Sequence, residues 1–104
     1  MKTRREKLEA MLQKEPNDAF LNFGLAMELV KEGLTDRAVA SFDNVLRNDP
    51  DYTAAHYHKG NTLIAAGRLG EAKEVLTVGV AAARRVGNSH AEGEMLGLLD
   101  GIAS

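Results

Sequence analysis

The chain has 104 residues, of which 44% are hydrophobic, so it is long and apolar enough for one folded domain that removes more than ~60% of its unfolded-chain surface from water. Its 13 basic and 15 acidic residues give a net charge of -2, which lacks the basic surplus typical of proteins that bind nucleic-acid phosphates. It has no cysteine, and disulfides and thiolate metal sites are therefore excluded.

The N-terminal segment predicts a helix over residues 4–15. Thr3 and Glu6 have the spacing of a capping box, in which the two side chains bond backbone N–H groups of the first turn. The opening stretch, MKTRREKLEAML, is charged where a secretory signal peptide is apolar, and no run approaches the ~20 apolar residues of a membrane span. A cytoplasmic location is therefore the default expectation.

The middle of the chain repeats with a period of 34 residues. Pro16 and Pro50, the only prolines, are 34 positions apart and each follows an acidic residue in similar stretches, LQKEPN and LRNDPD. Residues 53–86 align beneath residues 19–52 without a gap. The matched pairs include Leu29 and Leu63, Gly33 and Gly67, Ala38 and Ala72, and Phe42 and Leu76. The same frame extended backwards places Leu8, Met11 and Leu12 on Phe42, Val45 and Leu46.

The first repeat predicts two helices, over residues 19–32 and from about 35 to 48. Leu21, Leu25 and Leu29 step by four and are expected to form the core face of the first of these helices. Gly33 is a natural stop, and Thr35 or Asp36 is the expected cap of the second helix.

The second repeat follows the same plan. Asp51 is the expected cap of a helix that runs to about Ala66, Gly67 makes the turn, and residues 71–86 form the partner helix, which ends at Gly87. A capping box of Ser89 and Glu92 then predicts a last helix over residues 89–103. Its apolar stripe is formed by Met95, Leu98, Leu99 and Ile102.

Six helices and no strand signal predict an all-α fold in one domain, residues 1–104. The spacing resembles the tetratricopeptide repeat, which places a large and a small residue in its first helix, Gly at the turn, and Ala, an aromatic residue and Pro in its second helix. The first repeat matches with Leu25, Ala26, Leu29, Gly33, Ala38, Phe42 and Pro50; the second matches with Gly60, Leu63, Gly67, Ala72 and Leu76. The resemblance implies a right-handed superhelical stack of antiparallel helix pairs, with residues 4–15 and 89–103 as flanking helices.

A second apolar stripe on residues 19–32 is the most informative functional feature, because surface helices are normally polar there. The stripe consists of Phe20, Phe23, Met27 and Val30. By the resemblance, these positions line a concave groove in which a partner peptide or helix binds. The matching positions of the second repeat are Ala54, Tyr57, Asn61 and Ile64, with Lys31 and His58 as further polar contacts. The alternative is that Phe20, Phe23 and Met27 pack on a neighbouring helix and that Lys31 and Asn61 are merely solvated.

One variant of the family clamps a C-terminal carboxylate with Lys and Asn side chains. Phe23, Met27 and His58 stand at those positions here, so the clamp is not expected. His56 and His58 are two residues apart and point in different directions on a helix, which disfavours a metal site. The carboxylates are scattered and show no recognisable arrangement of a nucleophile and a base, and the sequence has no glycine-rich phosphate-binding loop. Neither a cofactor nor an enzymatic activity is therefore expected.

The leading hypothesis is a protein–protein interaction module without catalytic activity that binds a partner peptide or helix. The second hypothesis is self-association through the apolar terminal helices, or a place within a longer repeat array. The third is binding of single-stranded RNA, which the net charge disfavours.

Overall fold

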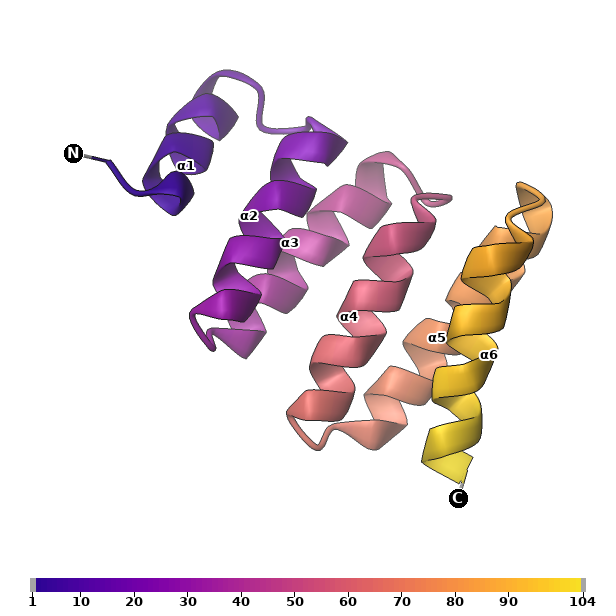
Figure 1. Cartoon of the computed structure of the whole chain (residues 1–104). Coiled ribbons are helices and arrows are strands. Elements are labelled where there is room, and N and C mark those ends of the chain that lie inside the picture. The colour runs from indigo at the N-terminus through magenta and orange to yellow at the C-terminus, as the bar shows by residue number, and fades with distance from the viewer. Residues whose placement is uncertain (1, 104) are drawn as a thin grey trace. The chain divides into compact units, whose positions relative to one another are not determined.

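The computed structural model describes residues 2–103 and contains six α-helices in this part of the chain (Figure 1). Their bounds are α1 Arg4–Lys14, α2 Ala19–Lys31, α3 Thr35–Asn48, α4 Thr53–Ala65, α5 Leu69–Arg85 and α6 Ser89–Ala103. The expected helices are confirmed, and no strand occurs among residues 2–103. The chain divides into two compact units, Met1–Pro50 and Asp51–Ser104, and each unit is described by itself.

The first unit contains α1, α2 and α3. The helix α1 begins with the expected capping box of Thr3 and Glu6, and Leu8 is its one buried residue. The helix α2 packs along α3 and buries Asn22, Ala26 and Leu29. From α3 come Ala38 and Phe42, both fully buried. The small residue Ala26 therefore lies in the core of a helix pair, as the repeat pattern predicts.

The core face of α2 differs from the expected leucine stripe. Leu29 is buried, but Leu21 and Leu25 are only half-buried, and Asn22 and Ala26 are buried instead. Asn22 is a polar residue in a core position because its side chain Nδ2 donates to the carbonyl oxygens of Pro16 and Asp18, each at 3.0 Å. These bonds satisfy a buried amide and hold the loop between α1 and α2.

The second unit contains α4, α5 and α6. Its apolar core consists of Leu76, Val80, Ala83, Ala91 and Met95, contributed by α5 and α6. Two glycines allow side chains of neighbouring helices to approach the backbone closely. A Cβ atom at Gly60 would lie 2.4 Å from Leu76 Cδ2, and one at Gly79 would lie 2.5 Å from Met95 Sδ and 2.7 Å from His56 Cβ. His56 is buried at this contact, so it is a core residue and not part of an exposed His pair.

Three helices end in the same glycine turn. Gly33, Gly67 and Gly87 have φ angles of 75°, 76° and 70°, which suit glycine because it lacks the Cβ atom that penalises this conformation. The residue after each glycine donates its N–H to a carbonyl five residues earlier, for example Leu34 to Leu29 at 3.0 Å. The stops inferred from the sequence are therefore confirmed.

Three expected caps are wrong. The residues preceding α3 and α4 are Leu34 and Tyr52, neither of which caps its helix with its side chain. Thr35 and Asp36 are already helical, and Asp51 pairs with Arg85. At α6, Asn88 Oδ1 accepts from Ala91 N at 3.0 Å, so Asn88 takes the role expected of Ser89. The cap of α2 is Asp18, which accepts from Leu21 N at 2.8 Å.

Candidate functional site

A hollow of about 360 Å³ lies between α1 and α2 in the first unit. Its lining residues are Arg4, Leu8, Phe20, Phe23, Gly24, Met27, Glu28 and Lys31. Four of the predicted groove residues, namely Phe20, Phe23, Met27 and Lys31, are thus brought to one place. The fifth predicted residue of this helix, Val30, is half-buried and lies outside the lining.

The two phenylalanines of this hollow differ in how far they pack against the core. Phe23 is half-buried, and its ring is tilted by 60° against that of the core residue Phe42, with centroids 6.1 Å apart. Phe20 is 75% exposed, so it does not pack into the core or under α1. An aromatic ring held in solvent beside an apolar hollow is the largest uncovered apolar group of the first unit.

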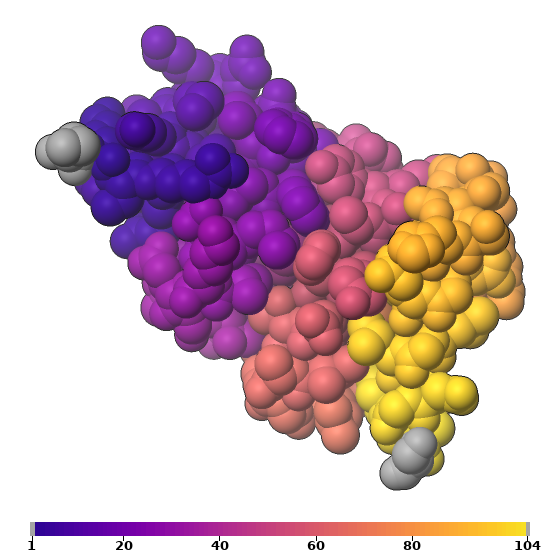
Figure 2. Space-filling model, viewed as in Figure 1, coloured from indigo at the N-terminus to yellow at the C-terminus, as the bar shows by residue number. Residues whose placement is uncertain are grey.

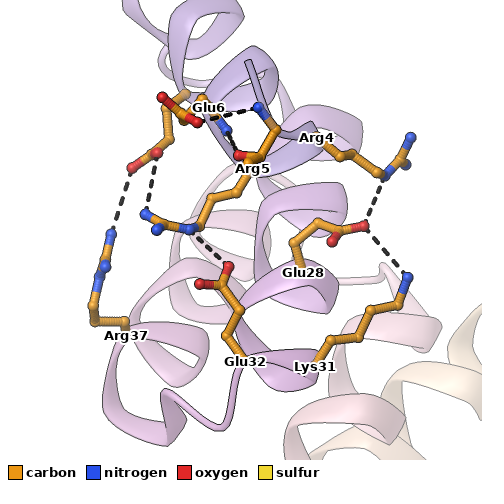
Figure 3. A network of polar contacts seen from close by, with 9 residues as sticks. Arg4, Arg5, Glu6, Glu28, Lys31, Glu32 and Arg37 are labelled. Carbon is orange, nitrogen blue, oxygen red and sulfur yellow. Dashed lines mark hydrogen bonds and ion pairs between the residues drawn. The ribbon is translucent and has the colours of Figure 1, made fainter. Parts of the chain in front are cut away.

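A charged rim crosses the hollow at Glu28. The Glu28 carboxylate accepts from Arg4 Nε at 2.8 Å and from Lys31 Nζ at 3.4 Å (Figure 3). The side chain of Glu28 is only 15% exposed, whereas those of Arg4 and Lys31 are 70% and 71% exposed. Two cations around one carboxylate leave the rim with one positive charge in excess.

Further ion pairs position α1, the outer wall of the hollow. Arg5 Nε lies 2.7 Å from Glu32 at the end of α2, and Glu9 lies 3.4 Å from both Arg5 and Arg37 of α3 (Figure 3). Each exposed pair contributes little by itself, roughly 0–1 kcal/mol. Together they supplement the burial of Leu8, which contacts α2 where a Cβ on Gly24 would lie 3.4 Å from Leu8 Cδ2.

The predicted groove residues of the second repeat are divided between two hollows and one exposed position. Tyr57 and His58 line a hollow of about 330 Å³ between α4 and α6, together with Thr53, Ala54, Asn88, His90, Ala91 and Glu94. The Tyr57 ring meets the His58 ring edge-on, at 5.0 Å and 84°, and Tyr57 also packs against the apolar core. Burial lowers the pKa of His58, and the nearby carboxylate of Glu94 opposes this shift.

The remaining two residues have different surroundings. Ile64 packs against the core and lines another hollow of about 370 Å³ with Leu69, Gly97, Leu98, Gly101 and Ile102. Asn61 is exposed. The helix α6 therefore covers much of the surface of α4 that the repeat pattern predicted to be open.

Sequence reasoning missed the contribution of the flanking helices. Arg4 and Leu8 of α1 line the first hollow, and His90 and Glu94 of α6 line the second. The available signal was the alignment of Leu8 with Phe42, which marks Leu8 as the residue of α1 that faces its neighbour.

The described residues offer little for other kinds of site. Across residues 2–103, no three His, Cys, Asp or Glu side chains are grouped so that they could hold a metal ion. None of the helices in this part of the chain has the length and apolar character needed to cross a membrane.

Comparison with known proteins decides the family. The tetratricopeptide repeat family model matches residues 29–91, which is more than half of the chain. The chain belongs to the tetratricopeptide repeat family. Proteins of this family are generally interaction modules without catalytic activity, so this tetratricopeptide protein is an interaction module in that general sense.

Relatives of similar length support the assignment. The chain is 36% identical over 90 residues to the TPR repeat-containing protein PA0015 of Pseudomonas aeruginosa, and the match covers 86% of each chain. The solution structure of protein BPP2914 from Bordetella parapertussis is 29% identical, with a TM-score of 0.85 over 99% of this chain and 90% of that one. A tetratricopeptide repeat domain protein of Salinibacter ruber is 28% identical, with a TM-score of 0.74 over 83% and 96% of the two chains. The all-α tetratricopeptide fold inferred from the repeat spacing is thus confirmed.

Proposed function

We propose that this tetratricopeptide protein binds an extended or helical segment of a partner protein on the exposed face of α2. The observation that carries the proposal is Phe20, which is 75% exposed at the edge of an apolar hollow of about 360 Å³. Because the ring lies mostly in water, it contributes little to the core of the first unit, and its place beside an apolar hollow is what makes it informative. Aromatic side chains of this kind are the usual anchors of protein interfaces.

The size of the hollow indicates what enters it. Its volume is near the lower end of the ~300–1,000 Å³ typical of ligand sites, which suits one or two side chains of a peptide better than a large cofactor. Leu8, Phe23 and Met27 provide an apolar floor, and Met27 adds a flexible side chain that adapts to different partners.

The support under the hollow favours binding without rearrangement. Phe23 is fixed by its contact with Phe42, a fully buried core residue, and Arg4 and Lys31 are oriented by Glu28. A preorganised surface loses less conformational entropy when a partner binds.

The contribution of α4 belongs to the same proposal. Tyr57, His58, Asn61 and Ile64 are proposed as partner contacts within the second unit, with Tyr57 and Asn61 orienting a partner backbone. The exposed amide of Asn61 is the group most accessible for this purpose. Ile64 packs against the core of the second unit and is proposed only as a contact at its exposed edge.

The proposal is tested with peptides selected from a display library on the wild-type protein. Amide chemical-shift mapping is expected to place the largest changes between residues 20 and 31. Phe20→Ala is expected to weaken binding at least about tenfold, because truncation of an interface hot spot typically costs about 2 kcal/mol or more and ~1.4 kcal/mol is already tenfold.

The matched control is Val78→Ala, which truncates a 58% exposed apolar residue on α5. Val78→Ala should leave the affinity unchanged, and neither variant should change the melting temperature appreciably. Selected peptides that bind equally well to wild type and Phe20→Ala, with shifts confined to other helices, would refute the proposal.

A further inference from the structure

The two flanking helices have the most opposed charges in the molecule. The helix α1 carries Arg4, Arg5, Lys7 and Lys14 against Glu6 and Glu9, a net charge of +2. The helix α6 carries Glu92, Glu94 and Asp100 and no Lys or Arg, a net charge of -3 with His90 neutral. The four helices between them each carry net charges of 0 or +1.

Each of these helices also has an uncovered apolar residue among its charges. On α1, Lys7, Met11 and Lys14 are exposed and share one face because they are spaced by four and three residues. Met11 is 47% exposed at the centre of that face. Neither Lys7 nor Lys14 takes part in an ion pair described above, so this face carries two lysines that α2 and α3 do not use.

The outer face of α6 offers a matching surface. Leu96 is 42% exposed and lies in a hollow of about 460 Å³ between α5 and α6. The hollow is lined by Lys73, Thr77, Leu96, Gly97, Leu99, Asp100 and Ala103. Its large apolar residues are Leu96 and Leu99, its charged residues are Asp100 and Lys73, and a Cβ atom at Gly97 would meet nothing within 4 Å. A flexible methionine side chain can fill such an open, irregular hollow.

We propose that the hollow beside Leu96 on α6 binds the Met11 face of α1 from a second copy of this chain. Figure 2 shows the surfaces of both helices, with α1 in indigo and α6 in orange to yellow. Met11 of one copy enters the hollow, and Lys7 and Lys14 lie over the acidic helix α6 of the other copy. The contact joins two different surfaces, the Met11 face (the head) and the hollow beside Leu96 (the tail), so it is heterologous. A pair of copies therefore keeps one free head and one free tail.

The order of the helices is consistent with this contact. Residues Leu8, Met11 and Leu12 align with the second helix of a repeat, and α6 follows the second helix of the second repeat. In the order of a repeat, α6 stands where the first helix of a third repeat would be, and α1 corresponds to a second helix. A contact between α6 of one copy and α1 of another therefore pairs a first helix with a second helix. The chain uses that kind of pairing twice within itself, in α2 with α3 and in α4 with α5.

The contact is small and partly electrostatic, which sets the conditions for detecting it. Interfaces well under ~1,200 Å² are weak, so association is expected only at protein concentrations of roughly 0.1–1 mM. Raising the salt from about 0.02 to 0.5 M shortens the Debye length severalfold and is expected to weaken it. Sedimentation velocity should show an average mass that rises with concentration and falls with salt.

Two variants that each block one surface distinguish this contact from a symmetric one. Met11→Glu places an acidic group on the head, where it would face the acidic helix α6, and Leu96→Asp places a charge in the hollow of the tail. Each variant alone is expected to remain monomeric. An equimolar mixture is expected to form a one-to-one dimer and nothing larger, because one intact tail meets one intact head.

The control is Val78→Asp, which introduces the same charge on an exposed apolar residue outside the hollow and should associate as the wild type does. Far-ultraviolet circular dichroism and melting curves check that each variant is folded. A wild type that stays monomeric to about 1 mM at low salt would overturn the proposal. So would a mixture of the two blocked variants that forms no dimer, because that result indicates a symmetric contact or none.

Discussion

The first helices of the two repeats, α2 and α4, occupy equivalent places in the sequence but present different surfaces. On α2, Phe20, Phe23 and Met27 face an apolar hollow whose outer wall is α1. On α4, Tyr57 and His58 face a more polar hollow beneath α6, and Ile64 packs against the core. The comparison shows that the repeat pattern determines which helix face points outward, while the flanking helix determines how much of that face stays open.

The flanking helices are held by different forces. One buried leucine and a set of ion pairs from Arg4, Arg5 and Glu9 attach α1. An apolar core that includes the fully buried Met95 attaches α6. Burial is worth more than exposed charge pairs, so α6 is expected to be the more firmly attached helix.

The largest expected effect comes from the core under α6. Met95→Ala should lower the free energy of unfolding by about 2–5 kcal/mol, because it leaves a cavity against Gly79 and His56. Leu8→Ala, which truncates the buried residue of α1, should lower the free energy of unfolding by less, because Leu8 is not part of a larger apolar core contributed by its helix. Chemical denaturation measures both. Equal losses would mean that the two helices are attached in the same way.

Gly60→Ala is expected to cost about 1–3 kcal/mol, since the added methyl group would lie 2.4 Å from Leu76 Cδ2. The first repeat has Ala26 at this position and a different neighbour, so the cost is specific to the second repeat. Gly70→Ala is the control, because its Cβ atom meets nothing within 4 Å and alanine is the better helix former. It should be neutral or stabilising, and a neutral Gly60→Ala would contradict the close packing of α4 on α5.

The two phenylalanines of the hollow should separate binding from stability. Phe23→Ala is expected to lower the free energy of unfolding by about 1–2 kcal/mol, because it removes the ring contact with Phe42 but the side chain is only half-buried. Phe20→Ala should change it by less than about 0.5 kcal/mol, as is usual for exposed positions. Thermal melts of the two variants check this, and equal destabilisation would place Phe20 in the core.

Salt should distinguish the two flanking helices. Raising the ionic strength to about 1 M screens the exposed pairs of α1 and is expected to lower the opening free energy of its amides by up to roughly 1 kcal/mol. The amides of α6 should gain protection or stay unchanged, because salt does not weaken apolar contacts. Amide hydrogen exchange resolves the two helices, and a uniform response would show that the charge network does not hold α1.

The smallest expected effect is a pH dependence in the second unit. Burial lowers the pKa of His58 below its ordinary value of 6.5, against the opposing charge of Glu94, with His90 also facing the same hollow. The unfolded chain then binds the proton more readily, so the free energy of unfolding falls as the pH drops below 6.5 and through the folded pKa. Wild type should lose more stability than His58→Gln between pH 7 and pH 5. An identical loss in melting experiments would show that His58 does not contribute.

The candidate site was predictable only in part. The stripe of Phe20, Phe23 and Met27 was visible because surface helices are normally polar at such positions, and the structure brings these residues to one hollow. The charged rim was not visible, because Arg4 and Glu28 are far apart in the sequence and meet only when α1 packs on α2. Three caps also failed. Thr35 is already the first residue of α3, Asp51 lies one residue before the cap position of α4, and Asn88 takes the place expected of Ser89.

The sequence by itself determined the helices, their turns and the family, because glycines and prolines act on the backbone locally and the 34-residue spacing repeats them. Tertiary structure decided which outward face remains open. Asn22 is buried and Leu25 half-buried because of the way in which α2 lies on α3, and Tyr57 is partly covered because α6 packs beside α4. Burial depends on which helices meet and at what distance, and a periodic sequence specifies the face of a helix without specifying its neighbour.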